Sequence, residues 1–366
     1  MDNFSSPKDT HSLLNQLQME LENENEVRIM EFCGGHTHQL VKSGLMSLLP
    51  DNLKMIHGPG CPVCVLPSEH IQAALDLLKS NSKLVVACFG DLMRIPTLGG
   101  DSLLGARSRG EDVRMVYDPT DLLKMAKNEP EKLFLFLAIG FETTAPATAR
   151  LIYRIDEQQI SNLKVYCLHV TTPPAIAVVM ENLRPERRPM GLIGPGHVSL
   201  VTGLDLYHQA SEKYSVPICI SGFETNDLLT SLVTLVKSIK NKKNKVYNEY
   251  TRALKSEGNL EAQKLLKKVF EFRKSFYWRG LGEISQSAYK ISPRYKEIDA
   301  EEFFKIKLSK VPEHKLCQCG SILRGEKSPL DCKLYAKACT PANPLGACMV
   351  SSEGTCSAYY AQGISV

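Results

Sequence analysis

The feature that most constrains this chain is a repeated alternation of short apolar runs, turn residues and helix-like stretches, which begins at Val27. Such alternation is typical of a parallel α/β sheet, in which helices connect successive strands. Several runs are apolar almost throughout, as expected of strands that helices cover on both faces. The pattern predicts eight strands, at residues 27–32, 53–57, 84–89, 113–117, 132–139, 163–169, 190–193 and 216–221.

Shifts in composition predict how these elements divide into domains. Residues 1–26 form a polar extension, and the strands that follow form two related parallel-sheet α/β domains, at 27–128 and 129–240. A basic stretch at 237–245 and a helical pattern to about residue 274 come next. The last part carries six of the twelve cysteines with little periodicity, so we predict that 241–366 is a helical and cysteine-rich domain without a large apolar core.

Two recurring motifs indicate that the α/β domains are related. Gly-Phe-Glu-Thr-Thr at 140–144 recurs as Gly-Phe-Glu-Thr-Asn at 222–226, and Gly-Pro-Gly at 58–60 recurs at 194–196. Each copy follows an apolar run. The alternative is that Gly-Pro-Gly is simply a tight turn and that the similarity arose by chance.

Charge and hydropathy exclude several classes of function. Lys and Arg number 44 against 40 Asp and Glu, so the net charge of +4 gives no support to nucleic-acid binding. No apolar run approaches the roughly 20 residues that span a bilayer, and the polar, acidic start is unlike a signal peptide. We therefore expect a cytoplasmic protein with neither nucleic acid nor membrane as a partner.

Unusual polar groups stand at the carboxyl end of nearly every predicted strand. In open parallel sheets this edge is where ligands bind, because loops and helix N-termini meet there. We therefore expect one common cleft lined by residues 33–38, 58–64, Gly90 and Asp91, 142–144, 169–172, His197 and Glu224.

The first of these loops, Cys33-Gly-Gly-His36-Thr-His38, combines a thiol and two imidazoles within six residues. Thiolate and imidazole both bind iron and zinc, and the glycines allow the backbone to approach closely. The loop is therefore a candidate metal site. The alternative is a structural turn with a buried thiol, since free cysteine is commonly a core residue.

The second loop carries Cys61-Pro-Val-Cys64 before a helix that begins near Ser68. This spacing permits either a reversible disulfide or two ligands on one metal, and a nearby helix N-terminus favours the thiolate. With Cys33 it would form a three-thiol group.

The six C-terminal cysteines are Cys317, Cys319, Cys332, Cys339, Cys348 and Cys356. Four thiolates suffice for a four-iron four-sulfur cluster or a structural zinc. Zinc usually prefers paired Cys-x-x-Cys units, which this segment lacks, so the spacing favours iron–sulfur; disulfides are disfavoured in a reducing compartment. Elsewhere, histidines and cysteines in or beside apolar stretches are expected to be core residues, namely His57, His70, His208, Cys88, Cys167 and Cys219.

Five motifs together carry a resemblance to a known family. They are Cys-Gly-Gly-His-Thr-His at 33–38, Gly-Pro-Gly-Cys-Pro-Val-Cys at 58–64, Gly-Phe-Glu-Thr-Thr-Ala-Pro at 140–146, Gly-Pro-Gly-His-Val-Ser at 194–199, and the tail from Cys339 to Cys356. From about Val27 to Tyr360 the chain resembles the HypD family of hydrogenase maturation factors. That family has two α/β domains and a cysteine-rich segment with a 4Fe-4S cluster.

The resemblance implies a scaffold on which an iron atom receives two cyanides and one carbon monoxide before delivery to the hydrogenase large subunit. Cys33 would hold that iron together with a cysteine of a small HypC-type chaperone, and a HypE-type partner would supply cyanide. The family's cluster pattern falls on Cys317, Cys332, Cys339 and Cys356 and leaves Cys319 and Cys348 as a nearby thiol pair.

These implications lead to a mechanistic hypothesis for the two loops. Cys33, His36 and His38 would form a soft iron site. Cys61 and Cys64, also candidate metal ligands, would pass electrons between the cluster and the iron-bound diatomic ligands as these form. Two other functions compete with this one. They are an iron–sulfur-dependent thiol–disulfide oxidoreductase that acts on a protein substrate, and a zinc-stabilised binding module. The sequence leaves open whether the scaffold is itself an enzyme.

Overall fold

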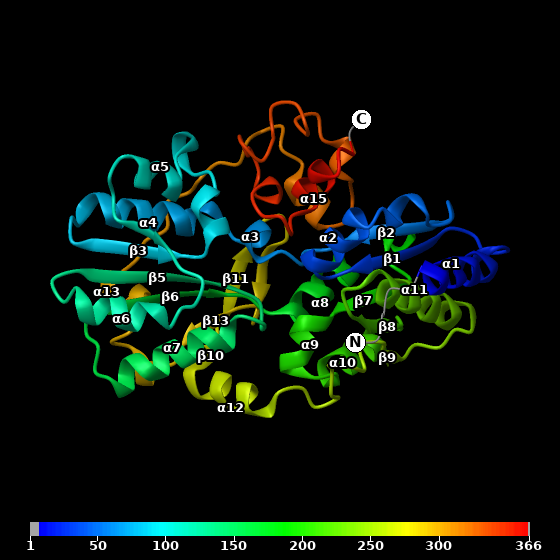
Figure 1. Cartoon of the computed structure of the whole chain (residues 1–366), viewed down its shortest axis with the longest axis horizontal. Helices are drawn as coiled ribbons and strands as arrows, with labels where there is room; N and C mark the ends of the chain where they lie inside the picture. The colour runs from blue at the N-terminus through cyan, green and yellow to red at the C-terminus, as the bar shows by residue number, and fades with distance from the viewer. Residues whose placement is uncertain (1–6, 365–366) are drawn as a thin grey trace.

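The computed structural model describes residues 7–364 and contains two parallel β-sheets flanked by helices (Figure 1). The cysteine-rich C-terminal segment lies between the two sheet units, at the top of the view. The predicted mixed α/β class with parallel-sheet domains is confirmed.

The first sheet has five parallel strands in the order β2-β1-β7-β8-β9. β1 lies inside the sheet between β2 and β7, and its Ile29 is paired with Met55 on one side and Gly191 on the other. The strands are β1 Val27–Glu31, β2 Leu53–His57, β7 Gly191–Pro195, β8 Ile218–Ser221 and β9 Val246–Asn248.

The second sheet has four parallel strands in the order β4-β3-β5-β6. Its residues are buried almost throughout, which explains the continuous apolar runs in the sequence. The strands are β3 Leu84–Cys88, β4 Val113–Met115, β5 Leu133–Gly140 and β6 Leu163–His169. All eight predicted strands are present, with ends that differ by at most two residues from those expected.

The chain builds these sheets in a nested order. It makes β1 and β2 of the first sheet, then all of the second sheet, and returns to the first sheet at β7. The boundary expected between residues 128 and 129 therefore falls between β4 and β5, which belong to the same sheet. Local alternation of strands and helices carries no information about which strands pair, so the sequence could not place this crossing.

Helices cover both sheets. The described helices are α1 Pro7–Leu21, α2 Gly34–Lys42, α3 Pro62–Val65, α4 Ser68–Ser80, α5 Leu103–Ser108, α6 Asp121–Asn128, α7 Ala145–Glu157, α8 Thr172–Asn182, α9 Gly196–Thr202, α10 Asp205–Tyr214, α11 Thr225–Lys240, α12 Leu260–Val269, α13 Ala300–Phe304, α14 Cys319–Leu323 and α15 Thr355–Ala361. Among the described residues, none of these helices is long and apolar enough to cross a bilayer.

Most of the polar N-terminal extension is a helix of the first sheet unit. α1 packs along α11, with Leu17 and Leu21 buried and Lys240 paired to Glu20 at 2.9 Å. Apolar residues at helical spacing produce this packing despite the polar composition. The first six residues of the extension lie outside the described part.

The segment after residue 240 differs from the predicted helical domain. Residues 246–248 form the edge strand β9 of the first sheet, and only α12 is helical before residue 274. Two short antiparallel pairs follow, made by β10 Phe270–Phe272 with β13 Tyr289–Ile291 and by β11 Ser275–Trp278 with β12 Gly282–Ser285. They pack on the second sheet, since the β13 region contacts β6 and Asp299 bridges to Val165.

The recurring motifs separate into two cases. The two Gly-Phe-Glu-Thr motifs follow β5 and β8, so they stand at equivalent positions of different sheets. Both Gly-Pro-Gly copies instead belong to the first sheet, after β2 and at the end of β7.

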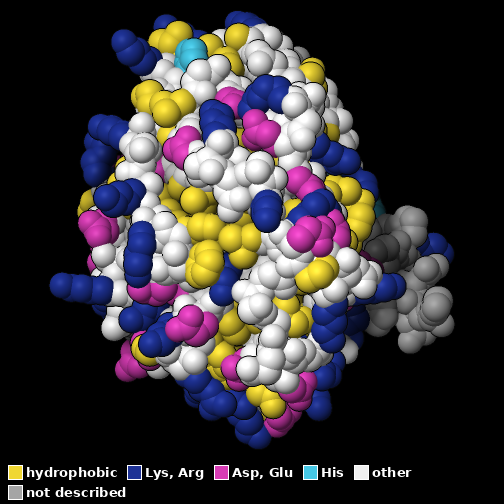
Figure 2. All heavy atoms as spheres, turned by 90° about the vertical axis from the view of Figure 1, so that its left-hand side faces the viewer, with side chains coloured by type: hydrophobic (Ala, Val, Ile, Leu, Met, Phe, Trp, Pro, Cys, Tyr) yellow, Lys and Arg dark blue, Asp and Glu magenta, His cyan; other side chains and the backbone are white. Residues whose placement is uncertain are grey.

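The face of the molecule at the left of Figure 1 is mixed in character. Figure 2 shows apolar side chains gathered in a hollow at its centre, bordered by both basic and acidic side chains. The second sheet unit contributes exposed apolar residues of this kind, among them Leu104, Met115 and Tyr117.

Candidate functional site

The loop that carries Cys33 connects β1 to α2, and Cys33 is the residue that caps the helix. Its carbonyl accepts hydrogen bonds from the backbone N–H groups of His36 and Thr37, at 2.9 and 3.1 Å. Cys33 as a residue is partly exposed. Burial raises the pKa of the Cys33 thiol to about 12, helped by the nearby carboxylates of Glu353 and Glu31. The free thiol is therefore protonated at neutral pH.

The fully buried carboxylate of Glu31 holds the Cys33 loop in place through hydrogen bonds. It accepts hydrogen bonds from the backbone N–H of Cys33 at 2.8 Å, from the hydroxyl of Thr37, and from Nδ1 of His57 at 2.9 Å. The Nε2 of His57 lies 3.0 Å from the hydroxyl of Tyr359 on α15. A continuous hydrogen-bonded chain thus connects the Cys33 backbone with the C-terminal helix.

The two histidines of the loop point to different neighbours. His36 is buried and stacks on Phe223 at 4.6 Å between ring centroids, and His197 stacks on the same ring at 3.9 Å. Neither ring nitrogen of His36 makes a hydrogen bond of ordinary geometry, and burial lowers its pKa to about 4. His38 is partly exposed, with Nδ1 3.3 Å from the carbonyl oxygen of Ser352. Among the described residues, no three potential ligands converge as they would on a single ion.

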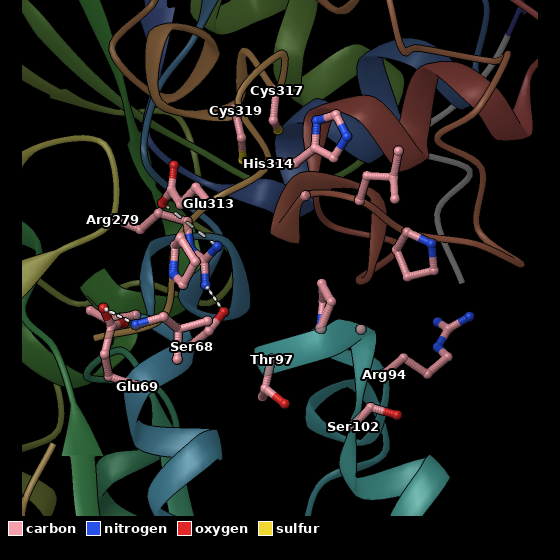
Figure 3. Close-up of a pocket in the computed structure, with 18 of the residues that line it drawn as sticks. Ser68, Glu69, Arg94, Thr97, Ser102, Arg279, Glu313, His314, Cys317 and Cys319 are labelled. Atoms are coloured by element: carbon pink, nitrogen blue, oxygen red, sulfur yellow. Dashed lines mark hydrogen bonds and ion pairs between the residues drawn. The ribbon is translucent and has the colours of Figure 1, made fainter. Parts of the chain in front are cut away.

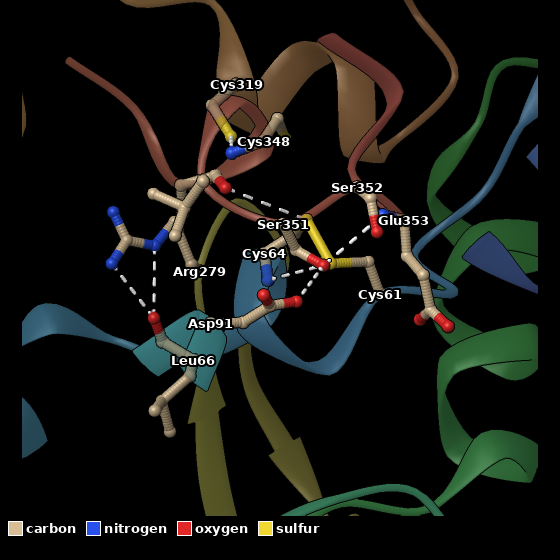
Figure 4. The surroundings of a disulfide bond; sticks show 12 residues. Cys61, Cys64, Leu66, Asp91, Arg279, Cys319, Cys348, Ser351, Ser352 and Glu353 are labelled. Carbon is tan, nitrogen blue, oxygen red and sulfur yellow. Dashed lines mark hydrogen bonds between the residues drawn. A yellow bond between two sulfur atoms is a disulfide. The ribbon is translucent and has the colours of Figure 1, made fainter. Parts of the chain in front are cut away.

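The Cys61-x-x-Cys64 loop lies directly against the Cys33 loop. Gly34 N–H donates to the Gly60 carbonyl at 3.2 Å, and a Cβ at Gly60 would lie 2.4 Å from the backbone nitrogen of Cys33. Only glycine permits this approach of the two backbones. Cys61 and Cys64 form a buried disulfide, with Cys61 capping α3 (Figure 4). The structure therefore brings the three predicted thiols into neighbouring loops.

Residues 347–353, which we call the wedge segment, lie between the edges of the two sheets. On the side of the second sheet, Arg94 donates to the Val350 carbonyl at 2.7 Å and Ser351 donates to Asp91 at 2.6 Å. On the other side the segment meets both functional loops. Its contacts there are the Cys64 sulfur 3.9 Å from the Ala347 carbonyl oxygen, His38 beside Ser352, and Glu353 against Gly34.

All six C-terminal cysteines line one small cavity of about 20 Å³. Side-chain hydrogen bonds connect Cys317 with Cys319, Cys319 with Cys348, and Cys348 with Cys356. Backbone N–H groups also point at two sulfurs, Leu345 at that of Cys339 (3.3 Å) and Cys348 at that of Cys319 (3.4 Å). The thiols of Cys317 and Cys348 hydrogen bond to the Cys319 sulfur, so its pKa is lowered and theirs are raised.

Glu142 and His169, at the edge of the second sheet, make internal contacts. Glu142 accepts hydrogen bonds from the backbone N–H and the hydroxyl of Thr172, at 2.9 and 3.0 Å, and burial raises its pKa to about 7. Nε2 of His169 lies 2.8 Å from the Thr148 hydroxyl. These groups fasten α8 and α7 to the sheet. Glu224 in the recurring motif likewise caps α11.

The motifs around Cys33 and the cysteine cavity agree with comparisons to known proteins. The model of the HypD family, described as "Hydrogenase formation hypA family", matches residues 8–363. A relative from Cupriavidus necator, "Hydrogenase maturation factor HypD", is 47% identical over 340 residues, which cover 91% of this chain and 89% of the relative. The chain belongs to the HypD family. Proteins of the same printed name from Azotobacter vinelandii and Escherichia coli are 43% and 39% identical, over 99% and 98% of this chain and 96% and 97% of theirs.

Membership in the HypD family supports a role in hydrogenase maturation. Three residues near the Cys33 loop are not evident from the sequence motifs. These residues are Glu31, Phe223 and Tyr359. Of the three, Glu31 could have been found, because a carboxylate at the end of the mostly apolar strand β1 indicates a functional position. His57 is buried and hydrogen bonded, as predicted for a core residue, but its partners connect it to the site. His208 is exposed on α10, which contradicts the prediction that it is a core residue.

The donor set of the cysteine cavity fits a four-iron four-sulfur cluster in its chemistry. Four thiolates are required, each on a different iron, so the sulfurs need not converge on one point. N–H groups aimed at sulfur are a second feature of such sites. A cavity of about 20 Å³ holds no more than one water molecule, so the cysteine side chains have to turn outward to admit a cluster.

Proposed function

We propose that this chain is the scaffold on which one iron atom acquires two cyanides and one carbon monoxide for a nickel–iron hydrogenase, and that Cys33 holds the iron. The observation that carries the proposal is the position of Cys33. Cys33 is a partly exposed residue and stands where the disulfide loop, the wedge segment and the Glu31 network meet. Thiolate is a suitable donor for iron.

Binding the iron requires that the Cys33 thiol lose its proton, because the thiolate is the ligand. The pKa of about 12 means that the positive metal has to displace that proton, which keeps the empty site unreactive at neutral pH. A HypC-type chaperone would contribute a further ligand at this partly exposed residue. A HypE-type partner would deliver cyanide to the iron held there.

The neighbouring cysteines suit the supply of electrons. The Cys61–Cys64 disulfide can accept two electrons and two protons to become two thiols. Cys317, Cys332, Cys339 and Cys356 are the residues that would hold a 4Fe-4S cluster, which supplies single electrons when bound. Cys319 and Cys348 touch each other, and Cys348 follows Ala347, whose carbonyl lies beside the Cys64 sulfur.

The test is Cys33→Ala, with Cys88→Ala as the matched control because Cys88 is buried in the second sheet. We expect the purified complex with the small chaperone to lose the infrared bands of iron-bound cyanide and carbon monoxide in the first variant only. Bands at full strength in Cys33→Ala would show that another residue holds the iron.

The thiol–disulfide oxidoreductase is the second candidate, because a disulfide and a contacting thiol pair lie so close together. Repeated turnover of an added protein disulfide, without stoichiometric iron bearing diatomic ligands, would favour that function.

A further inference from the structure

The positive charge of the chain is concentrated in residues 305–340, which include four of the C-terminal cysteines. This stretch carries eight Lys and Arg against three Asp and Glu. The whole chain carries 44 against 40, so the rest of it carries 36 against 37 and is nearly neutral. An excess of positive charge on one part of an otherwise neutral protein favours an acidic partner at that place.

The acidic side chains of this stretch do not neutralise all of its lysines, because each acidic group is engaged with another partner. These partners are Arg279 for Glu313 at 3.7 Å, Arg324 for Glu326 at 2.9 Å, and the backbone N–H of Ser328 for Asp331 at 2.8 Å.

Three lysines, which we call the lysine surface, stand beside cysteines that would hold a cluster. All three are exposed, and none forms an ion pair with a residue between 7 and 364. Successive Cα atoms are about 3.8 Å apart, so each lysine Cα lies within about 8 Å of a cysteine Cα. The three pairs are Lys315 before Cys317, Lys333 after Cys332, and Lys337 before Cys339.

The cavity of the six thiols comes nearest to the outside at Cys317. Among the C-terminal cysteines of the described chain, Cys317 alone is not buried, and the neighbouring Leu316 is 55% exposed. Cys317 and Cys319 also line a larger cavity of about 910 Å³, where both are labelled in Figure 3. A cluster held by Cys317 therefore has one side close to the protein surface, with lysines near it.

The lysine surface suits a brief contact better than a permanent one. The exposed large apolar side chains of residues 305–340 are only Leu308, Leu316 and Leu330, whereas permanent interfaces bury large apolar areas. Complexes for electron transfer are small and depend on complementary charge for rapid association. A carrier that has given up its electron has to leave before the next one arrives, so attraction by charge with little apolar burial fits that task.

We propose that the lysine surface docks a small acidic electron-carrier protein, one with an iron–sulfur or flavin centre, and that electrons enter the cysteine-rich segment at Cys317. Carboxylates of the carrier contact the three lysines, and Leu316 lies at the centre of the contact. One electron leaves the reduced carrier and enters the cluster, and no covalent bond forms or breaks. This inference rests on the electron-supply part of the proposed function and names where the electrons enter.

The test uses a plant-type ferredoxin as the acidic probe and the full-length chain with its cluster. Fluorescence anisotropy of the labelled ferredoxin measures binding, and stopped-flow absorption measures the rate at which reduced ferredoxin reduces the cluster. We expect the combined variant Lys315→Gln, Lys333→Gln and Lys337→Gln to weaken binding and slow this reduction on the order of tenfold, because three charged contacts are lost. Added salt should weaken binding to the unaltered chain.

Two controls separate docking from other effects. The combined variant Lys242→Gln, Lys243→Gln and Lys245→Gln removes the same charge from an exposed stretch elsewhere and should leave binding within about twofold of the unaltered chain. Reduced methyl viologen, a small cation that needs no docking surface, should reduce the cluster of all three proteins at rates within about twofold of one another.

Each outcome decides the inference. Unchanged binding in the lysine-surface variant, or equal losses in both triple variants, overturns the docking surface. Weaker binding without slower reduction by ferredoxin overturns the entry of electrons at this place. If methyl viologen also becomes slower, the variant has damaged the cluster, and the binding comparison, which needs no cluster, decides alone. A DNA duplex that displaces ferredoxin at equal concentration overturns the carrier as the partner. The infrared test of Cys33→Ala decides the proposed function separately.

Discussion

Replacing Gly60 by alanine tests whether the close approach of the two functional loops matters. The added Cβ would lie 2.4 Å from the Cys33 nitrogen and 2.5 Å from its Cα, and both atoms are backbone. Ordinary contact begins at 3.4 Å, so the loops have to separate by about 1 Å. Overpacking of this kind costs about 1–3 kcal/mol of stability. A displacement of about 1 Å in a reacting geometry lowers a rate on the order of 100-fold.

The assay combines urea unfolding with the yield of iron-bound cyanide and carbonyl bands in the complex with the small chaperone. We expect a folded Gly60→Ala protein that is less stable by about 1–3 kcal/mol and loses most of the infrared signal. Gly90→Ala is the control, because the Cβ there would meet only the flexible end of Met115 at 3.0 Å. If Gly60→Ala matches Gly90→Ala in both measurements, the contact between the loops does not position Cys33.

Two further predictions concern buried polar groups. Burial raises the pKa of Glu142 from 4.5 to about 7. Between these two pH values the folded state holds a proton that the unfolded state releases. The free energy of unfolding should therefore fall by on the order of 3 kcal/mol as the pH rises from 4.5 through 7. Glu142→Gln cannot titrate, and its urea midpoint should change less between pH 5 and pH 8; parallel curves for the two proteins would contradict this. Tyr359→Phe removes the partner of His57 Nε2 and should cost about 1–3 kcal/mol in urea unfolding, whereas Tyr360→Phe, on an exposed residue, should change nothing. Equal stability of the two tyrosine variants would mean that the His57 bond contributes nothing.

Local patterns explain what could be predicted from the sequence. Each apolar run by itself indicates a buried strand, so the sequence predicts β5 and β6 to within one residue of their observed ends. The glycine-rich loops likewise indicate the sheet edge where Cys33 and Cys61 lie. Contacts between residues far apart in the sequence leave no pattern in the residues around either partner. The contact of Phe223 with His36 joins the loops that follow β1 and β8, and that of Tyr359 with His57 joins residues 302 positions apart.

Composition misled the prediction at both ends of the chain. The N-terminal extension reads as polar, yet Leu17 and Leu21 share one helix face and pack on α11. The segment after residue 240 reads as helical from its charged residues, yet Val246–Asn248 completes a sheet whose other strands were already in place. In both cases the neighbouring element, and not the segment's own composition, decides the structure.

The wedge segment has a consequence for how the protein is made. It comes late in the sequence, yet it touches loops that come early, at Gly34, His38 and Cys64. Both sheets can therefore form during synthesis before this segment has been made, while the surroundings of Cys33 stay incomplete. The environment of the Cys33 thiol is therefore completed only after the strands of both sheets have been synthesised.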